Sequence, residues 1–160
     1  MREYIVPTLV LLLLPSVSAQ VVPAGWQIVK DSKGACQIAV PPDWSLYGDN
    51  TGAAVFHDVS TAIAVVTSQP GQVFKALTES LQKSFGIQKE KMFENSAKRT
   101  FYQDRTSGNS EDPNAYTVSV PSKSGTCSGR ITFLPSIPAD VARKIALSLG
   151  PLPEPPDGTR

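Results

Sequence analysis

Residues 35–44 are A-C-Q-I-A-V-P-P-D-W, and the expected fold is built outward from them. Cys36, Ile38 and Val40 alternate with a polar residue and a small one, which is the period of a strand with one buried face. The strand should end at Pro41, because proline has no N–H to donate to a sheet. We expect the apolar face of this strand to seed the core.

The two cysteines of the chain predict a disulfide bond. Cys127 lies in a second alternating segment, residues 126–133, where it shares a strand face with Ile131 and Phe133. Cys36 faces the core from the first segment, so both sulfur atoms should point inward. In an oxidising compartment a single pair of cysteines forms a disulfide by default. Two free buried thiols or a redox pair are the alternatives, although the chain has no C-x-x-C motif.

The N-terminal residues predict export. Arg2 precedes an apolar run at residues 5–14, and Val17-Ser18-Ala19 fits the small-x-Ala cleavage pattern of a secretory signal peptide. We therefore predict cleavage after Ala19 and a secreted or periplasmic mature chain. A membrane anchor is the alternative, but the run has about 10 residues where a spanning helix needs about 20. No later segment is apolar enough to span a bilayer.

Length and charge place limits on the mature chain. Residues 20–150 are long enough for a single domain with one core, and residues 151–160 read as a proline-rich disordered tail. The net charge is +1, and removal of Arg2 and Glu3 leaves it unchanged. This balance gives no reason to expect nucleic-acid binding. A locally basic stretch at residues 83–99 contains interleaved glutamates, which favours a solvated surface over the alternative of a polyanion site.

Further strands are predicted from β-rich or alternating segments at residues 26–30, 44–47, 53–57, 62–67, 97–103 and 115–120. The segments at 53–57 and 62–67 are rich in alanine and valine, so we expect them to be buried on both faces. Residues 104–113 contain no apolar side chain and predict a solvated loop. Residues 87–95 fit either a helical turn or a loop.

Two helices are predicted from apolar residues at helical spacing. Residues 72–85 place five apolar side chains on one stripe, which we assign to the core: Val73, Phe74, Leu77, Leu81 and Phe85. The last helix begins near Pro138 and buries Val141, Ile145 and Leu149. Neighbouring runs of strands indicate an α+β fold, with an antiparallel sheet of about six to eight strands and two main helices packed on it.

The order of these elements resembles the family of PsbP, an extrinsic subunit of photosystem II, and of the Ran-binding Mog-type import factor. In this family a strand runs into a Val-Pro-Pro-x-Trp turn, which here is Val40-Pro41-Pro42-Asp43-Trp44. The resemblance covers about residues 26–149 and implies an antiparallel sheet between helices. It also implies a non-catalytic adaptor or assembly factor. No residue matches a family metal site or Ran-contacting surface, so neither function is carried over.

The sequence offers no set of residues that predicts catalysis. His57 is the single histidine, and Asp58 beside it in a strand would point to the opposite face, so the two do not form a base and its orienting partner. Four-ligand zinc lacks ligands, and the calcium-loop and phosphate-loop patterns are absent. We predict no catalytic residue, no metal site and no cofactor.

Four aromatic side chains are candidates for a binding surface: Trp44, Tyr47, His57 and Tyr102. Such residues are enriched at binding hot spots, and core packing is the alternative for each. We expect a secreted or periplasmic, non-enzymatic domain that binds a partner protein or a cell-envelope component. The alternative is a small ligand-binding protein or hydrolase with a pocket between the sheet and the first helix.

Overall fold

The computed structural model describes residues 20–48, 52–109 and 111–153. The predicted signal peptide and most of the predicted tail lie outside these ranges. The strands are Gln27–Lys30 (β1), Cys36–Val40 (β2), Ser45–Leu46 (β3), Ala53–Phe56 (β4), Ala62–Pro70 (β5), Met92–Asn95 (β6), Thr100–Arg105 (β7), Asn114–Ser122 (β8), Gly125–Phe133 (β9) and Gly150–Pro151 (β10). The helices are Glu79–Ser84 (α1), the 3₁₀ turn Lys89–Lys91 (η1) and Ala139–Leu147 (α2).

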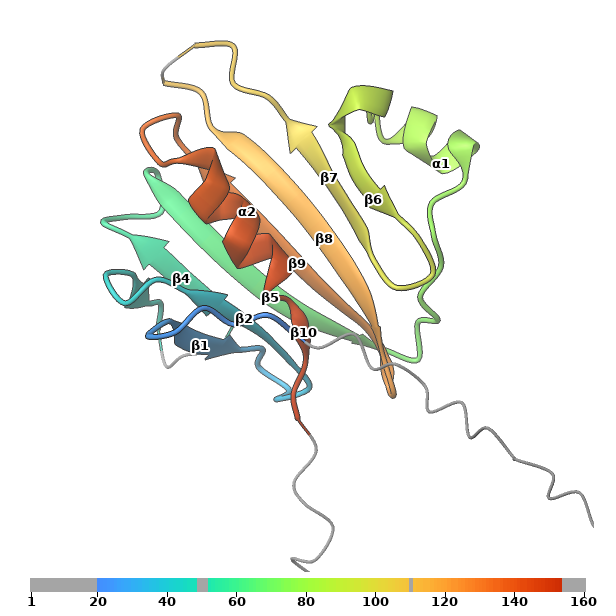
Figure 1. Ribbon diagram of the computed structural model, residues 1–160, viewed down its shortest axis with the longest axis horizontal. Helices are drawn as coiled ribbons and strands as arrows, with labels where there is room; N and C mark the ends of the chain where they lie inside the picture. The colour runs from blue at the N-terminus through green and yellow to red at the C-terminus, as the bar shows by residue number, and fades with distance from the viewer. Residues whose placement is uncertain (1–19, 49–51, 110, 154–160) are drawn as a thin grey trace, which may run out of the picture.

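A seven-stranded antiparallel sheet forms the body of the described chain, in the order β3-β4-β5-β9-β8-β7-β6 (Figure 1). Its long strands β5, β9 and β8 have nine residues each and lie next to one another. The α+β class and the antiparallel pairing are confirmed, and the strand number of this sheet falls in the predicted range.

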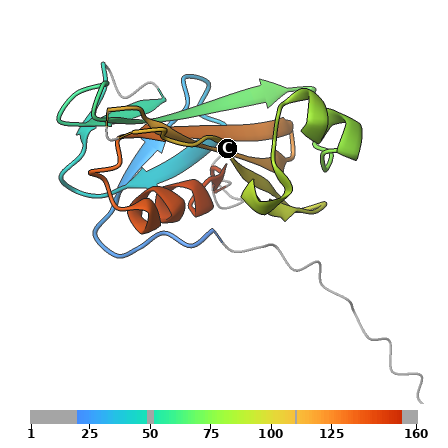
Figure 2. The same ribbon diagram turned by 90° about the horizontal axis from the view of Figure 1, so that it is seen from above.

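The first two strands do not join this sheet, which corrects the expectation of a single one. β1 and β2 pair with β10 as a separate three-stranded sheet in the order β1-β2-β10. This small sheet and α2 lie on the same side of the large sheet (Figure 2). β2 and the residues between α2 and β10 reach Gly129 of β9, where a Cβ atom would lie 3.3 Å from the side chain of Ile38 and 3.5 Å from that of Leu149. The absence of a side chain at Gly129 thus permits the two layers to approach.

β2 is buried on both faces, not on one face as its alternating pattern predicts. All five of its residues are buried, including Gln37 and Ala39. The N–H of Ala39 donates to the hydroxyl of Ser148 at 2.7 Å, and the amide of Gln37 donates to Gln20 at 2.9 Å. β2 is the central strand of its small sheet and contacts β5, β9 and α2, and the side chain of Gln37 on its second face lies against Gln20.

The disulfide between Cys36 and Cys127 is confirmed. The two Cα atoms are 5.6 Å apart, and both residues are fully buried. The bond joins β2 of the small sheet to β9 of the large sheet across a sequence separation of 91 residues. It therefore fixes one sheet on the other.

Pro151, predicted as the first residue of the disordered tail, belongs to a strand instead. Residues 150–151 form β10, in which Pro151 pairs with Cys36, and the N–H of Leu152 donates to the carbonyl of Ala35 at 3.0 Å. β10 lies at the edge of its sheet, where the missing N–H of a proline is tolerated. The tail prediction for residues 154–160 falls outside the described residues.

The last helix packs on the sheet as predicted. α2 begins after Pro138, which adopts an extended ψ of 128°, and it buries Ala142, Ile145 and Ala146. Pro138 thus precedes the helix instead of occupying its first position. Ile145 is fully buried within the main core cluster.

The predicted first helix is wrong in length and in packing. Only residues 79–84 of the expected 72–85 are helical, and none of them is buried. Val73, Leu81 and Phe85 are 75 %, 43 % and 56 % exposed. α1 lies beyond the edge strand β6, at the opposite end of the large sheet from β1 (Figures 1 and 2). Within the described part of the chain, α2 is thus the helix that contributes to the core.

The other local predictions have mixed outcomes. The ambiguous residues 87–95 form η1 and β6. The ring of Phe93 in β6 packs on that of Phe101, with the ring centroids 4.9 Å apart. Residues 62–67 are buried on one face and half-buried or exposed on the other, so the expectation of two buried faces is wrong for β5. It is confirmed for the middle of β4, where the adjacent residues Ala54 and Val55 are both buried. Asp104 and Arg105, expected in a loop, extend β7.

Candidate functional site

Trp44 belongs to the core. Its side chain is 4 % exposed, and its ring lies 6.1 Å from the ring of Phe56. Its N–H donates to the carbonyl of Pro41 at 3.1 Å, and its own carbonyl accepts from the side chain of Gln27 at 2.5 Å. The residue is thus held inside the turn that follows β2, and it offers little surface to a partner.

Tyr47 and His57 are both exposed, but they do not form one surface. Tyr47 is 57 % exposed and follows β3, with its N–H bonded to the carbonyl of Ala53 at the start of β4. His57 follows the other end of β4. Four residues of an extended strand therefore separate them, about 13 Å along β4.

The turn at His57 is a local structure closed by its neighbour. His57 has a positive φ of 60°, and the N–H of Asp58 donates to the carbonyl of Phe56 at 2.8 Å. The carboxylate of Asp58 accepts from Ser60 and Thr61, and these hydrogen bonds lower the pKa of Asp58 to about 2. Asp58 thus closes its own turn and does not orient the imidazole.

Tyr102 lies in a polar cluster on the uncovered face of the large sheet. Strand register places Tyr102 opposite Thr117, and Thr117 opposite Arg130. The carboxylate of Asp104 accepts a hydrogen bond from the Thr117 hydroxyl at 3.1 Å and forms an ion pair with Arg130. Burial raises the pKa of the Tyr102 phenol, and the negative charge of Asp104 raises it further. The phenol therefore stays protonated at neutral pH.

The cluster around Tyr102 is built as a structural unit. Its carboxylate is paired with a guanidinium, and none of its four members is a histidine or cysteine available to act as a base or nucleophile. The atom Oδ1 of Asp104 is buried and has no hydrogen-bond partner among the described residues. The analysis of the sequence missed Asp104, Thr117 and Arg130. Of these three, Arg130 could have been recognised from the sequence, since it is the one charged residue in the apolar strand segment 126–133.

The four sequence-predicted residues therefore do not meet. Trp44 is inside, Tyr47 and His57 flank β4, and Tyr102 lies on β7. Three strands, β5, β9 and β8, separate β4 from β7 in the sheet. At about 4.8 Å per strand, that separation is about 19 Å.

A different exposed region stands out, and sequence analysis had assigned it to the core. We call residues 71–86 the arm. Its exposed apolar side chains are Val73, Leu81 and Phe85. The arm is fixed at its start, where the N–H of Gly71 donates to the carbonyl of Ser124 at 2.8 Å, and the carbonyl of Gln72 accepts from the Thr126 hydroxyl at 2.8 Å.

The middle of the arm is held by one side chain of β6. The amide oxygen of Asn95 accepts from the N–H of Leu77 at 2.8 Å, and the amide nitrogen of Asn95 donates to the Leu77 carbonyl at 2.9 Å. Asn95 thus satisfies both backbone groups of Leu77, as a neighbouring strand would. Beyond the helix, Ile87 is 9 % exposed and anchors the end of the arm.

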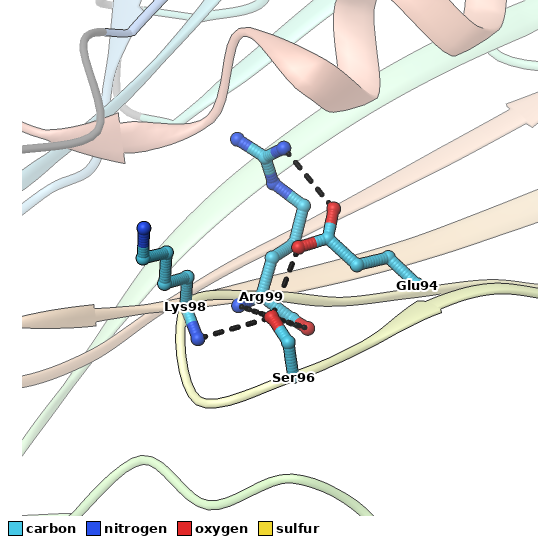
Figure 3. Close-up of polar contacts among 4 residues, drawn as sticks. All are labelled: Glu94, Ser96, Lys98 and Arg99. Carbon is cyan, nitrogen blue, oxygen red and sulfur yellow. Dashed lines mark hydrogen bonds and ion pairs between the residues drawn. The ribbon is translucent and has the colours of Figure 1, made fainter.

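The β6–β7 hairpin beside the arm is ordered by its own polar contacts (Figure 3). The hydroxyl of Ser96 accepts from the N–H groups of Lys98 and Arg99, both at 3.2 Å, and donates to Glu94 at 3.0 Å. Glu94 also forms an ion pair with Arg99 at 3.4 Å. The hairpin is therefore a fixed support for Asn95, and the Lys98 side chain remains exposed.

The region around the arm carries the positive charge of the chain. Residues 72–99 contain six lysine or arginine residues and three glutamates, a net charge of +3. The rest of the sequence contains nine basic and eleven acidic residues, a net charge of −2. The exposed apolar side chains of the arm therefore stand in a locally positive field.

The comparisons with known proteins identify no relative: no family model, no curated protein and no solved structure matches this chain. In the described ranges, three or more metal-binding side chains do not gather at any point. No helix among the same residues has the length and apolar character needed to cross a membrane.

Proposed function

We propose that the mature chain is an exported, non-enzymatic domain that binds a partner protein or a cell-envelope component. The observation that carries this proposal is the uncovered arm, with Val73 75 % and Phe85 56 % exposed. Exposed apolar surface marks interaction sites in soluble proteins, and the arm carries three of the eight exposed large apolar side chains among the described residues. The arm is held in place by Asn95 and by the start of β9, so it presents these side chains from a defined position.

Two further features support the same proposal. The Cys36–Cys127 disulfide fits an oxidising compartment, as export by the predicted signal peptide requires. The resemblance of residues 40–44 to the PsbP and Mog-type family, which remains a proposal, also points to a non-catalytic adaptor. Each of these features is independent of the arm.

The alternative of a ligand-binding protein or hydrolase needs a pocket between the sheet and the first helix. Such a pocket requires α1 to lie on the sheet, and α1 buries none of its residues. Tyr102, which this alternative would use, belongs to the ion-paired cluster of the open face. The observations therefore favour binding through the arm.

A site-specific photo-crosslinking experiment tests the proposed function. A benzophenone amino acid replaces Phe85 in one variant and Tyr47 in a matched control, because both side chains are about equally exposed. Each oxidised protein is irradiated with the envelope fraction of its source cells, and adducts are identified by mass spectrometry. We expect a discrete adduct from position 85 that Leu81→Ser abolishes. The same adducts from both positions would overturn the proposal.

A further inference from the structure

We propose that the arm docks on an anionic lipid surface, and that its helix lengthens toward Val73 when it does so. This inference rests on the proposed function and names the envelope component by its chemistry. It is carried by the spacing of the apolar residues, by the contacts that now interrupt the helix, and by the charge around the arm.

The apolar residues of the arm would form one stripe on a longer helix. Val73, Leu77, Leu81 and Phe85 follow one another at intervals of four. At about 100° per residue these side chains span about 120°, and Phe74 falls inside the same sector. In the structure only Glu79–Ser84 is helical, so Val73 and Leu81 are exposed on separate segments. The sequence is thus patterned for a longer helix than the free protein forms.

Asn95 occupies the backbone groups that the longer helix would use. In a helix extended to Val73, the N–H of Leu77 would bond to the carbonyl of Val73, and the carbonyl of Leu77 would accept from Leu81. Asn95 holds both of these Leu77 groups, at 2.8 and 2.9 Å. The N–H of Leu81 bonds instead to the Thr78 hydroxyl at 3.3 Å, which caps the short helix. The two hydrogen bonds of Asn95, which we call the latch, therefore hold the arm in its short-helix form.

Contact with an apolar surface shifts the equilibrium between the short and the long helix of the arm toward the long one. In water Val73, Leu81 and Phe85 are exposed in the short form, and Phe74 and Leu77 are half-buried, so the long helix gains no burial there and the Asn95 contacts favour the short form. On a lipid interface the long helix removes its aligned apolar side chains from water together. The short form removes less apolar surface from water, because its apolar residues lie on separate segments. Binding and helix growth are therefore coupled, because the surface interacts better with one of the two states.

The charges indicate which surface this is. On the extended helix, Lys75 and Lys83 would both lie on the polar side, each about 140° from the centre of the stripe, where basic side chains are typical of interfacial helices. With Lys89, Lys91 and Lys98 nearby, the region carries the net charge of +3. A second copy of the chain would bring an equal positive charge to the same place, which opposes self-association. Anionic headgroups complement it.

Vesicle binding tests the inference on the full mature, oxidised protein. Sucrose-loaded vesicles contain either phosphatidylcholine alone or phosphatidylcholine with 30 mol % phosphatidylglycerol. We expect sedimentation with the anionic vesicles, at least tenfold weaker binding to the neutral ones, and loss of binding as salt is raised. Far-ultraviolet circular dichroism should show added helix only with the anionic vesicles. Equal binding to both vesicles, or binding without added helix, would overturn the inference.

Two variants locate the effect. Leu81→Ser with Phe85→Ser should weaken vesicle binding at least tenfold. The control, Tyr47→Ser with Val59→Ser, removes two exposed side chains outside the arm and should bind as the unaltered protein does. Equal loss in both variants would contradict docking through the arm.

The latch has its own test. Asn95→Ala should bind anionic vesicles about three- to tenfold more tightly and should show more helix before lipid is added. Since a destabilised fold would also alter the spectrum, thermal unfolding of the variant must remain cooperative. Unchanged affinity and unchanged helix content would rule out the latch.

The outcomes also separate this inference from the proposed function. A specific protein adduct at position 85 without vesicle binding would overturn lipid docking and leave the proposed function standing. A dimer in sedimentation equilibrium that Leu81→Ser with Phe85→Ser dissociates would overturn lipid docking too, in favour of a second copy as the occupant.

Discussion

At the scale of single residues, Asp31 shows how a charged side chain can hold a turn together. It is 5 % exposed and accepts four hydrogen bonds, from the N–H groups of Lys33, Ala35 and Cys36 and from the hydroxyl of Ser68. Burial acts to raise the pKa of Asp31, but the hydrogen bonds outweigh it and lower the pKa below the usual 3.8. The ionised carboxylate therefore ties the β1–β2 turn to β5.

Asp31→Asn should lower the free energy of unfolding at pH 7 by about 1–3 kcal/mol, because an amide cannot accept the same set of hydrogen bonds. The pKa of Asp31 is lower in the folded state, so its contribution is present above about pH 4 and is lost as the pH falls through the folded pKa. Urea unfolding at pH 7 and pH 3 checks this prediction. The gap between the two proteins should shrink at pH 3, and a constant gap would contradict the assignment.

His57 is an exposed residue whose backbone conformation is constrained. Its φ of 60° favours glycine over any residue with a Cβ. We predict that His57→Gly is more stable than His57→Ala by about 1 kcal/mol. Thermal unfolding of the two variants measures the difference. If the alanine variant melts at the same temperature or higher, the positive φ is not a source of strain.

At the scale of elements, the two helices have similar patterns and different surroundings. Both carry apolar residues at intervals of four, and sequence analysis assigned both stripes to the core. α2 is covered on that stripe by β8, β9 and β2, whereas α1 lies beyond the last strand of the sheet. A periodic pattern identifies an apolar face, and only the position of the element determines whether the protein itself covers that face.

Single truncations should distinguish the two helices. Ile145→Ala on α2 removes a fully buried side chain and should lower the free energy of unfolding by about 2–5 kcal/mol. Leu81→Ala on α1 removes a side chain that is 43 % exposed and should cost less than about 0.5 kcal/mol. Equilibrium unfolding in urea measures both values. A large loss for Leu81→Ala would show that α1 packs on the domain.

At the scale of the whole molecule, the disulfide joins two sheets that share no strand. Replacing both Cys36 and Cys127 with serine should lower the free energy of unfolding by about 4–5 kcal/mol, because the closed loop in the unfolded chain is long. We expect a markedly lower melting temperature with an unchanged far-ultraviolet spectrum at low temperature. Equal melting of the native and the doubly substituted protein would contradict a role for the bond in stability.

The sequence by itself determined the features that depend on local pattern and chemistry. Alternation located most of the strands, though not β6 or β10, the two cysteines on inward faces predicted their bond, and Ile145 predicted the buried face of α2. These inferences succeed because side-chain period follows from backbone geometry. The strand period also puts the neighbours Phe101 and Tyr102 on opposite faces of β7, and in the structure Phe101 is the buried one.

Only the tertiary structure decided which segments cover one another. The strand of residues 36–40 pairs with Gly150–Pro151 and is buried on both faces, although its pattern predicts one. Trp44 is inside, Tyr102 joins Asp104 and Arg130, and the arm is left uncovered. Burial depends on residues that are distant in sequence, and no local period reports them. The candidate site therefore appeared where a predicted core helix has no neighbour to pack against.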